Sequence, residues 1–374
     1  MIKKLFLFAL IALSITGCDD VMEAVTGTKR GSIGNPYEML VVCNEDVWEA
    51  PAGRALFNTL DTDIPGLPQS ERSFRISRVD EERFQGMSKA FRNIIFVDIN
   101  ESKYTQTAFK FTRDVFAKPQ VFMKIQSPSM QDFEKFVTAN SQVIVDFFTK
   151  VEMERQIEVL QSSYNEDSYK VVEEMFGCEL RIPYQLGGHK KSKDFVWLSD
   201  FNTPRAEIMS FVVYSYPYTS TDNFKKENYI HTRDSVMKEN MQGNKPGQYM
   251  RTVDWTVDIV EGMYRDRYIQ VARGLWEMEN DIMGGPFVSH SVVDEVNNRV
   301  IVAEAFVYAP NRKKGSLMRK LEASLYTLRL PADKLIENSN KLEEFVIKAN
   351  DEQRLNHNNC RYRQSTYKPL SKKS

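Results

Sequence analysis

Hydrophobic residues recur along this chain at two spacings, and the alternation between them outlines the secondary structure. Short runs rich in β-branched and aromatic residues, bounded by Gly, Pro, Asn or Asp, predict strands. Stretches with an apolar residue every three or four positions predict amphipathic helices. Strands are expected at residues 37–43, 73–79, 92–99, 120–126, 179–186, 195–198 and 208–216, and helices at 51–60, 129–162, 169–176, 223–241 and 313–328.

Capping and turn residues sharpen this outline. Ser129 is suited to cap the N-terminus of the longest helix, and Gly177 to follow the C-terminus of another. Gly284-Gly285-Pro286 reads as a connecting loop. Two hairpins are expected, residues 252–260 with 264–272 turning at Glu261-Gly262, and residues 292–296 with 300–307 turning at Asn297-Asn298.

The mixture of strands and helices predicts an α+β fold, with antiparallel or mixed sheets and packed helices. A further helix is expected to contain residues 112–116. Its Thr-Arg-Asp triplet at 112–114 and the same triplet at 232–234 in the helix at 223–241 suggest two related α/β units, although chance similarity explains them more simply. The expected organisation is a signal peptide (1–17), a lipidated cysteine with a flexible tether (18–35), two α+β units (36–165 and 166–330), and a short helix at 342–349 within a mobile polar tail (331–374).

The first residues form a basic start followed by a short apolar run. Lys3 and Lys4 precede the apolar residues 5–15, which are too few for a membrane span of roughly 20 residues. This arrangement is typical of a secretory signal peptide.

The end of this run resembles the lipobox of bacterial lipoproteins. Ile15-Thr16-Gly17-Cys18 combines an aliphatic residue, two small residues and a cysteine. The resemblance implies diacylglycerol transfer to the Cys18 thiol, cleavage before it, and acylation of the new amino group by a chain such as palmitate. The alternative is an ordinary secretory signal in which Cys18 is incidental.

The acidic residues after Cys18 are compatible with two cellular locations, the inner membrane and the cell surface. Asp19 resembles the inner-membrane retention signal of enteric bacteria, whereas Asp19, Asp20 and Glu23 together resemble a surface-export signal of Bacteroidota. A plain polar tether is the third interpretation. The periplasmic or surface face therefore stays open at this point.

Composition and charge narrow the classes of function. The 374 residues include 50 Lys and Arg against 51 Asp and Glu, a formal net charge of −1, which disfavours nucleic-acid binding. The four histidines form no metal motif, and no nucleotide-binding or hydrolase motif occurs, so no cofactor and no metal are expected. Beyond Cys18, the cysteines Cys43, Cys178 and Cys360 allow at most one internal disulfide, with Cys43–Cys178 as a pairing to consider and a buried thiol as the simpler reading of Cys43.

Two groups of side chains are candidates for a site. Aromatic residues on or near predicted strands are suited to stack on sugar rings or to contact a protein, although packing in the core is their ordinary role. They are Tyr214, Tyr216, Tyr218, Trp255 and Trp276. The carboxylates Asp254, Asp258 and Glu261 are the candidates for a glycosidase-like pair, because Asp254 and Asp258 share one face of a strand. A Ser-x-x-Lys string at Ser235–Lys238 lacks its partner motifs and is attributed to chance.

Together with the lipobox and tether, the opening strand NPYEMLVV (35–42), the Gly-Gly-Pro segment and the Asn-Asn hairpin resemble an uncharacterised lipoprotein family of Bacteroidota. The resemblance spans about residues 31–330 and implies an outer-membrane address, but no catalytic residues, because that family has no assigned activity. The first hypothesis is a non-enzymatic, membrane-anchored protein that binds an envelope protein or glycan. The second is an envelope hydrolase of glycan or cell-wall substrates, for which a concave pocket holding both Asp254 and Asp258 is the distinguishing feature.

Overall fold

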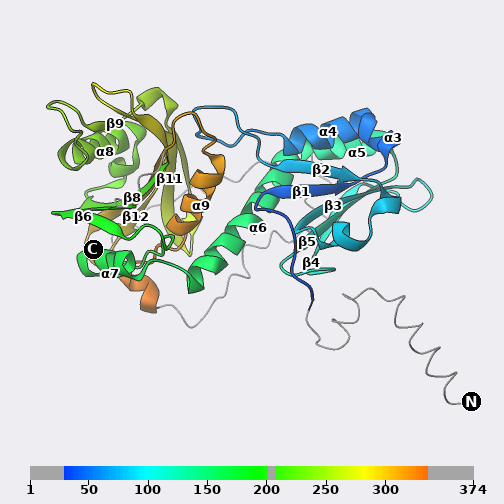
Figure 1. Cartoon of the computed structure of the whole chain (residues 1–374), viewed down its shortest axis with the longest axis horizontal. Coiled ribbons are helices and arrows are strands. Elements are labelled where there is room, and N and C mark those ends of the chain that lie inside the picture. The colour runs from blue at the N-terminus through cyan, green and yellow to red at the C-terminus, as the bar shows by residue number, and fades with distance from the viewer. Residues whose placement is uncertain (1–28, 201–206, 336–374) are drawn as a thin grey trace, which may run out of the picture. The chain divides into compact units, whose positions relative to one another are not determined.

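The computed structural model describes residues 29–200 and 207–335, which form two compact units. Within these ranges, the first unit comprises residues 29–63 and 72–155, and the second comprises residues 64–71 and 156–335. Both units combine helices with a sheet (Figure 1), which confirms the predicted α+β class. The signal peptide, Cys18, the 342–349 helix and Cys360 lie outside the described residues.

The first unit is built on a five-stranded sheet in the order β2-β1-β3-β5-β4, parallel except for the edge strand β4. Its strands are β1 (Glu38–Val42), β2 (Arg75–Val79), β3 (Asn93–Ile99), β4 (Ala108–Arg113) and β5 (Val121–Ser127). Its helical segments are α3 (Glu45–Glu49), α4 (Pro51–Leu60), η1 (Glu81–Arg83), η2 (Gly86–Ala90), α5 (Met130–Ala139) and α6 (Ser141–Ser162), the last continuing into the second unit.

Alternation along these strands places one set of apolar residues against the helices. Met39 and Ile95 are fully buried with Leu56 of α4 and Phe148 of α6. Such burial contributes roughly 1.5–3 kcal/mol for each large side chain.

Two polar clusters accompany this core. Glu152 of α6 is fully buried and accepts hydrogen bonds from Arg92 (2.9 and 2.8 Å), Asn93 (2.6 Å) and Arg155 (2.7 Å), so its charge is balanced and its oxygens are satisfied.

The second cluster surrounds Asp98. Burial opposes ionisation of this carboxyl group, but hydrogen bonds from Lys124, Tyr104 and Lys103 outweigh that effect and lower its pKa to about 2.

The second unit is built on a larger antiparallel sheet in the order β10-β11-β12-β13-β8-β7-β6, with β9 also paired to β11. Its strands are β6 (Gly188–Ser192), β7 (Phe195–Ser199), β8 (Ile208–Pro217), β9 (Met250–Thr252), β10 (Asp258–Tyr264), β11 (Arg267–Met278), β12 (Gly284–Asp294) and β13 (Arg299–Tyr308). Its remaining helical segments are α7 (Glu166–Phe176), η3 (Thr221–Phe224), α8 (Lys226–Asn240), η4 (Asp254–Thr256), α9 (Gly315–Leu325) and η5 (Pro331–Leu335).

Helices cover both faces of this sheet (Figure 1). Val172 of α7 and Leu321 of α9 pack on one face with Ile301. Tyr229 and Met237 of α8 pack on the opposite face with Val302. Because both faces are covered, the central strands β12 and β13 are buried nearly throughout rather than alternating between buried and exposed residues.

The short segment 64–71 joins the second unit through Glu71. This carboxylate accepts hydrogen bonds from the backbone N–H groups of Lys314 (2.7 Å) and Gly315 (3.0 Å) at the start of α9. An acidic group is favourable there because the first N–H groups of a helix have no partner within it.

Several predicted elements are confirmed. The helix at 51–60 has the predicted bounds, Ser129 caps α5 by accepting from the N–H of Asp132 (3.1 Å), and Gly177 ends α7 in the left-handed region (φ 66°). The Asn297-Asn298 hairpin joins β12 to β13.

Four predictions of local structure are wrong. The 129–162 helix is divided into α5 and α6 at Asn140, whose backbone leaves the helical region (φ −111°, ψ 17°) and whose side chain donates to the Phe136 carbonyl (2.8 Å). Residues 112–116 are no helix, since β4 ends at Arg113, and this removes one half of the suggested duplication. Residues 179–186 form no strand beyond a single bridge, because their apolar side chains pack into the core instead. Gly284-Gly285-Pro286 begins β12 rather than a loop.

The turn of the other hairpin also differs from the prediction. It lies at Arg265-Asp266, both with positive φ (50° and 59°), whereas Glu261-Gly262 lies within β10. Two consecutive residues with positive φ match the turn type whose twist suits a tight hairpin. Side chains other than Gly occupy them here, which explains why the sequence did not reveal the turn.

Cys43 and Cys178 are both buried, and the disulfide between them that the sequence raised is not formed. Burial raises the pKa of Cys43 to about 12, so this thiol is protonated and unreactive at neutral pH.

Candidate functional site

An open groove of about 750 Å³ runs along the solvent-facing side of α8 in the second unit. The helix contributes one side, and β9 with η4 contributes the other. The residues that line it are Lys226, Glu227, Ile230, His231, Asp234, Ser235, Lys238, Tyr249, Arg251, Asp254 and Trp255.

The helical period of α8 explains how one segment serves both the groove and the core. Tyr229, Arg233 and Met237 recur every four residues and are buried against the sheet. The positions one residue after each of these, Ile230, Asp234 and Lys238, line the groove. The groove is therefore the polar face of an amphipathic helix, closed on one side by a second segment.

Beneath the groove lies a buried ion pair. Arg233 and Glu304 of β13 are both fully buried and are joined by two hydrogen bonds of 2.9 and 2.7 Å. The guanidinium also lies 4.1 Å from the centre of the Phe287 ring. Although burial opposes its charge, Glu304 outweighs that effect and raises the pKa of Arg233.

Hydrogen bonds connect this pair to the groove. Arg233 donates to the Thr252 hydroxyl (2.8 Å), and Thr252 donates to Asp234 from its N–H (2.8 Å) and its hydroxyl (2.5 Å). The network fixes α8 against β9, and so fixes the separation of the two sides of the groove.

The cations of the groove are engaged. Lys226 donates to the Val257 carbonyl (2.5 Å), and Lys238 lies 4.8 Å from the centre of the Tyr249 ring. Arg251 forms ion pairs with two acidic residues of the neighbouring segment, at 2.5 and 2.7 Å. These contacts are intramolecular, so the positive charges are partly compensated before any ligand binds.

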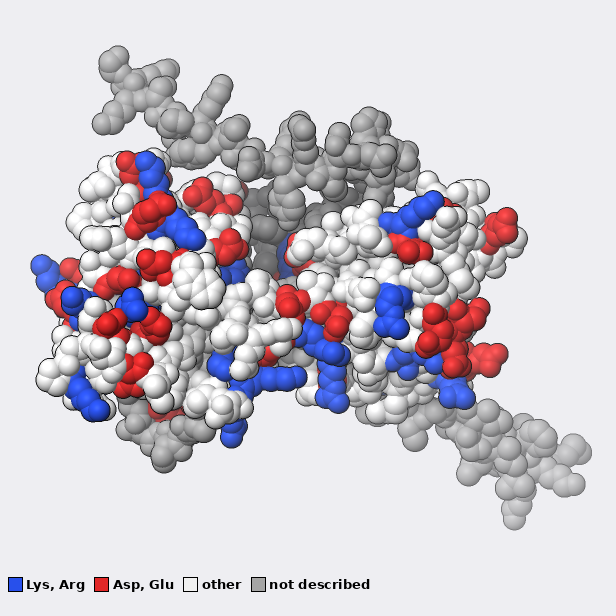
Figure 2. All heavy atoms as spheres, turned by 90° about the horizontal axis from the view of Figure 1, so that it is seen from above, with Lys and Arg blue, Asp and Glu red and all other residues white. Residues whose placement is uncertain are grey.

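Four polar or aromatic side chains of the groove lack a hydrogen-bonded or ion-paired partner. Among the described residues, no side-chain hydrogen bond or ion pair is formed by Glu227, His231, Asp254 or Trp255. Trp255 is 84% exposed, which is unusual for the largest apolar side chain. Figure 2 shows basic and acidic side chains interspersed over the face of the second unit at the left of the view.

The carboxylates that the sequence singled out are not brought together. Asp254 lies in η4 and lines the groove, whereas Asp258 begins β10 and Glu261 lies farther along it. The expectation that Asp254 and Asp258 share the face of one strand is therefore wrong, because a 3-10 turn separates them. Glu261 forms a hydrogen bond with Tyr268 on the neighbouring strand.

The candidate aromatic residues are likewise distributed. Tyr214 and Trp276 are buried in the core, Tyr216 and Tyr218 are half-buried beside it, and Trp255 alone of the five is exposed. Burial raises the pKa of Tyr216 to about 12.

Sequence reasoning missed His231, Tyr249 and Arg251 as groove residues. The Ser-x-x-Lys string does reach the groove, but the Ser235 hydroxyl donates to the His231 carbonyl (2.9 Å) and Lys238 contacts Tyr249. These contacts supply no pairing of the Ser235 hydroxyl with the Lys238 amine.

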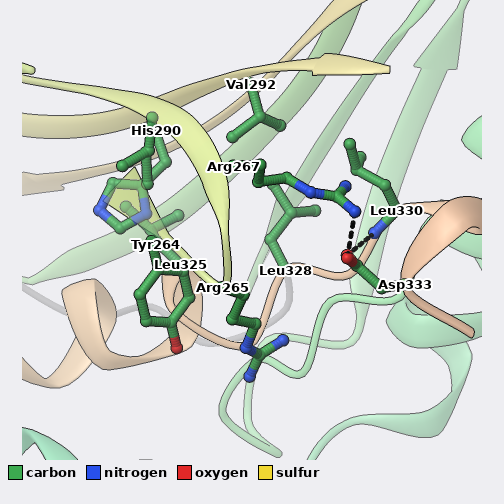
Figure 3. A pocket seen from close by; sticks show the side chains of 10 residues that line it. Tyr264, Arg265, Arg267, His290, Val292, Leu325, Leu328, Leu330 and Asp333 are labelled. Carbon is green, nitrogen blue, oxygen red and sulfur yellow. Dashed lines mark hydrogen bonds and ion pairs between the residues drawn. The ribbon is translucent and has the colours of Figure 1, made fainter. Parts of the chain in front are cut away.

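A second, smaller cavity lies on the α9 side of the same sheet (Figure 3). Its volume of about 20 Å³ is enough for a water molecule but not for an organic ligand. His290 lines this cavity and is fully buried. Burial and the positive charge of Arg273 together lower the pKa of His290 to about 3. Arg267 pairs with Asp333 across the cavity, and Asp333 also accepts from the N–H of Leu330 (2.7 Å).

Neither a metal-binding cluster nor a membrane-spanning helix occurs in the described part of the chain. No group of three or more His, Cys, Asp or Glu in residues 29–200 and 207–335 is arranged to hold a metal ion. In the same ranges, no helix has the length and apolar character needed to cross a membrane.

Both units of the chain are similar to protein families, and neither family has a known function. Residues 32–161 match a family described as a domain of unknown function (DUF8532), and residues 165–327 match another domain of unknown function (DUF4837). No curated protein matches the chain. A crystal structure of a protein from Bacteroides thetaiotaomicron is similar at 8% identity with a TM-score of 0.17, covering 41% of this chain and 44%, less than half, of that protein. The two units are thus each similar to a family whose function is unknown.

Proposed function

We propose that this protein is a lipid-anchored lipoprotein of the cell envelope that binds a partner through the groove along α8. The anchor is the Cys18 thiol of the lipobox, and the Bacteroidota resemblance favours the outer membrane. Two or three acyl chains hold a protein at a membrane durably, at about 0.8 kcal/mol for each buried CH₂.

The observation that carries the binding role is the exposure of Trp255 beside a groove of about 750 Å³. Burial of an exposed indole is favourable by several kcal/mol, so a partner that covers Trp255 gains this free energy on binding. Aromatic residues of this kind are frequent anchors of binding sites.

The carboxylates that the sequence singled out give the alternative hydrolase no support. Glycoside hydrolysis ordinarily needs two carboxyl groups facing one bond. Of Asp254, Asp258 and Glu261, the groove includes Asp254 alone. Asp234, also in the groove, is already hydrogen-bonded to Thr252, and the remaining groove carboxylate, Glu227, lies in the first turn of α8.

The anchor is tested by fractionation of cells that express the wild type or Cys18→Ser. The variant is expected to lose acylation and to leave the membrane fraction. Protease treatment of intact cells then distinguishes a surface location from a periplasmic one. Retention of Cys18→Ser in membranes at the wild-type level contradicts the proposed anchor.

The binding role is tested with a photo-crosslinking amino acid at position 235 in living cells, where Ser235 is exposed and lines the groove while Trp255 is retained. The same group at Tyr184, which is 73% exposed and does not line the groove, is the matched control. A product specific to position 235 is expected. Equal labelling from both positions, or none from either, counts against a binding groove.

A further inference from the structure

We infer that the ligand of the groove is an uncharged, hydroxyl-rich oligosaccharide that stacks on Trp255. This inference rests on the proposed function and specifies the ligand class of the same groove. Three properties of the groove support it: an exposed aromatic ring, equal numbers of basic and acidic residues, and a strand, β9, whose N–H groups already have partners.

The exposed aromatic ring is the indole of Trp255. A sugar ring has an apolar C–H face and a polar rim, and therefore matches a flat indole with hydrogen-bonding groups around it. Glu227, His231 and Asp254 are polar side chains of the groove without a side-chain partner, and they supply an imidazole that can donate or accept and two carboxylate acceptors for hydroxyl groups. A single ring of this kind provides much of the affinity in many sites.

The balance of charge argues against a strongly charged ligand. Three Lys or Arg residues and three Asp or Glu residues line the groove. Each of the three cations already contacts a carbonyl, an aromatic ring or a carboxylate. An acidic polymer would meet the unpaired carboxylate of Asp254, and it would find no free cluster of cations.

The backbone argues against a peptide. An extended peptide binds by adding a strand to a free edge, but the N–H groups of β9 already have partners. Met250 donates to the Met241 carbonyl (2.9 Å) and Thr252 to Asp234 (2.8 Å). A helical peptide needs an apolar groove, whereas Ile230 is the one aliphatic residue among those lining this one. Recognition by side chains alone suits a glycan.

The groove is also held in one shape before binding. The hydrogen bonds from Arg233 to Thr252 and from Thr252 to Asp234 join its two sides. A preorganised site loses less entropy when it binds, which matters for a ligand recognised by few contacts.

The test uses the full-length protein in detergent with a panel of hexasaccharides. The neutral probes are β-1,4-linked N-acetylglucosamine and β-linked glucose hexamers, and the acidic probe is a galacturonic acid hexamer. Binding is followed by tryptophan fluorescence and calorimetry. The variants are Trp255→Ala, Asp254→Asn and the control Tyr184→Ala, all changed at exposed positions so that the fold is expected to persist.

A neutral hexamer should bind to the wild type and to Tyr184→Ala, and about tenfold or more weakly to Trp255→Ala. The inference is overturned if no neutral hexamer binds, if the acidic hexamer binds more tightly, or if Trp255→Ala binds as the wild type does. A protein crosslinked specifically at position 235, without glycan binding, overturns the glycan inference and leaves the proposed binding role intact. Absence of both overturns both.

Discussion

The buried pair of Arg233 and Glu304 permits a quantitative prediction. Both side chains are fully buried and joined by two hydrogen bonds, so neither charge has access to water. Glu304→Gln removes the hydrogen-bonded countercharge and leaves the buried guanidinium with the more distant carboxylate of Asp234, 3.8 Å away. Breaking a buried pair in this way ordinarily lowers the free energy of unfolding by about 3–5 kcal/mol.

A matched control separates this effect from the mere loss of a carboxylate. Arg251 and Glu277 form an exposed pair, with 44% and 41% of the side chains accessible. Because water and salt screen such a pair, Glu277→Gln is expected to change the stability by less than about 1 kcal/mol. The two substitutions are chemically identical and differ in burial.

The assay must report the second unit alone, since a chain of two units need not unfold in one step. Trp48 lies in the first unit, whereas Trp197, Trp255 and Trp276 lie in the second. In a Trp48→Phe background, fluorescence during urea unfolding therefore follows the second unit. A cost for Glu304→Gln no larger than that for Glu277→Gln would refute the reasoning.

Three further predictions concern stability. Glu71→Gln should lower the free energy of unfolding by about 1–2 kcal/mol, measured by urea unfolding, because a charged acceptor for the first N–H groups of α9 is lost. Gly285→Ala should destabilise by more than about 2 kcal/mol, since its Cβ would lie 2.0 Å from the Val307 carbonyl oxygen; thermal unfolding unchanged from the wild type would contradict this. Asp98 has a depressed pKa of about 2, so its contribution is present above its unfolded value of about 4 and is lost as the pH falls towards 2; Asp98→Asn should flatten acid unfolding across that window.

Much of the fold follows from local patterns in the sequence. The helix at 51–60 and the capped ends at Ser129 and Gly177 were predicted because each depends on a few neighbouring residues. The failures involve longer-range effects. Residues 179–186 have the composition of a strand. Their apolar side chains pack in the core, but their backbone forms a single bridge and does not pair with the sheet.

The groove is harder to predict from sequence because its two sides are distant and its helical side resembles any solvated helix face. One signal was present in α8. Arg233 occupies the apolar stripe between Tyr229 and Met237, where an unpaired charge would be too costly. The pattern implies a buried partner, but not that Glu304, 71 positions away, supplies it.

The ion pair has an expected role beyond stability, and the two roles separate experimentally. Replacing both partners of a buried pair with apolar residues is often neutral or stabilising, so Arg233→Met with Glu304→Leu should recover most of the stability lost in Glu304→Gln. The double variant still lacks the hydrogen bond from Arg233 to Thr252 that helps to hold Asp234 and β9 beside α8. If the pair positions the groove, this variant should unfold near the wild-type urea concentration and yet bind the neutral hexasaccharide more weakly. If binding recovers together with stability, the pair acts only as packing, and the groove is shaped by the helix and strand themselves.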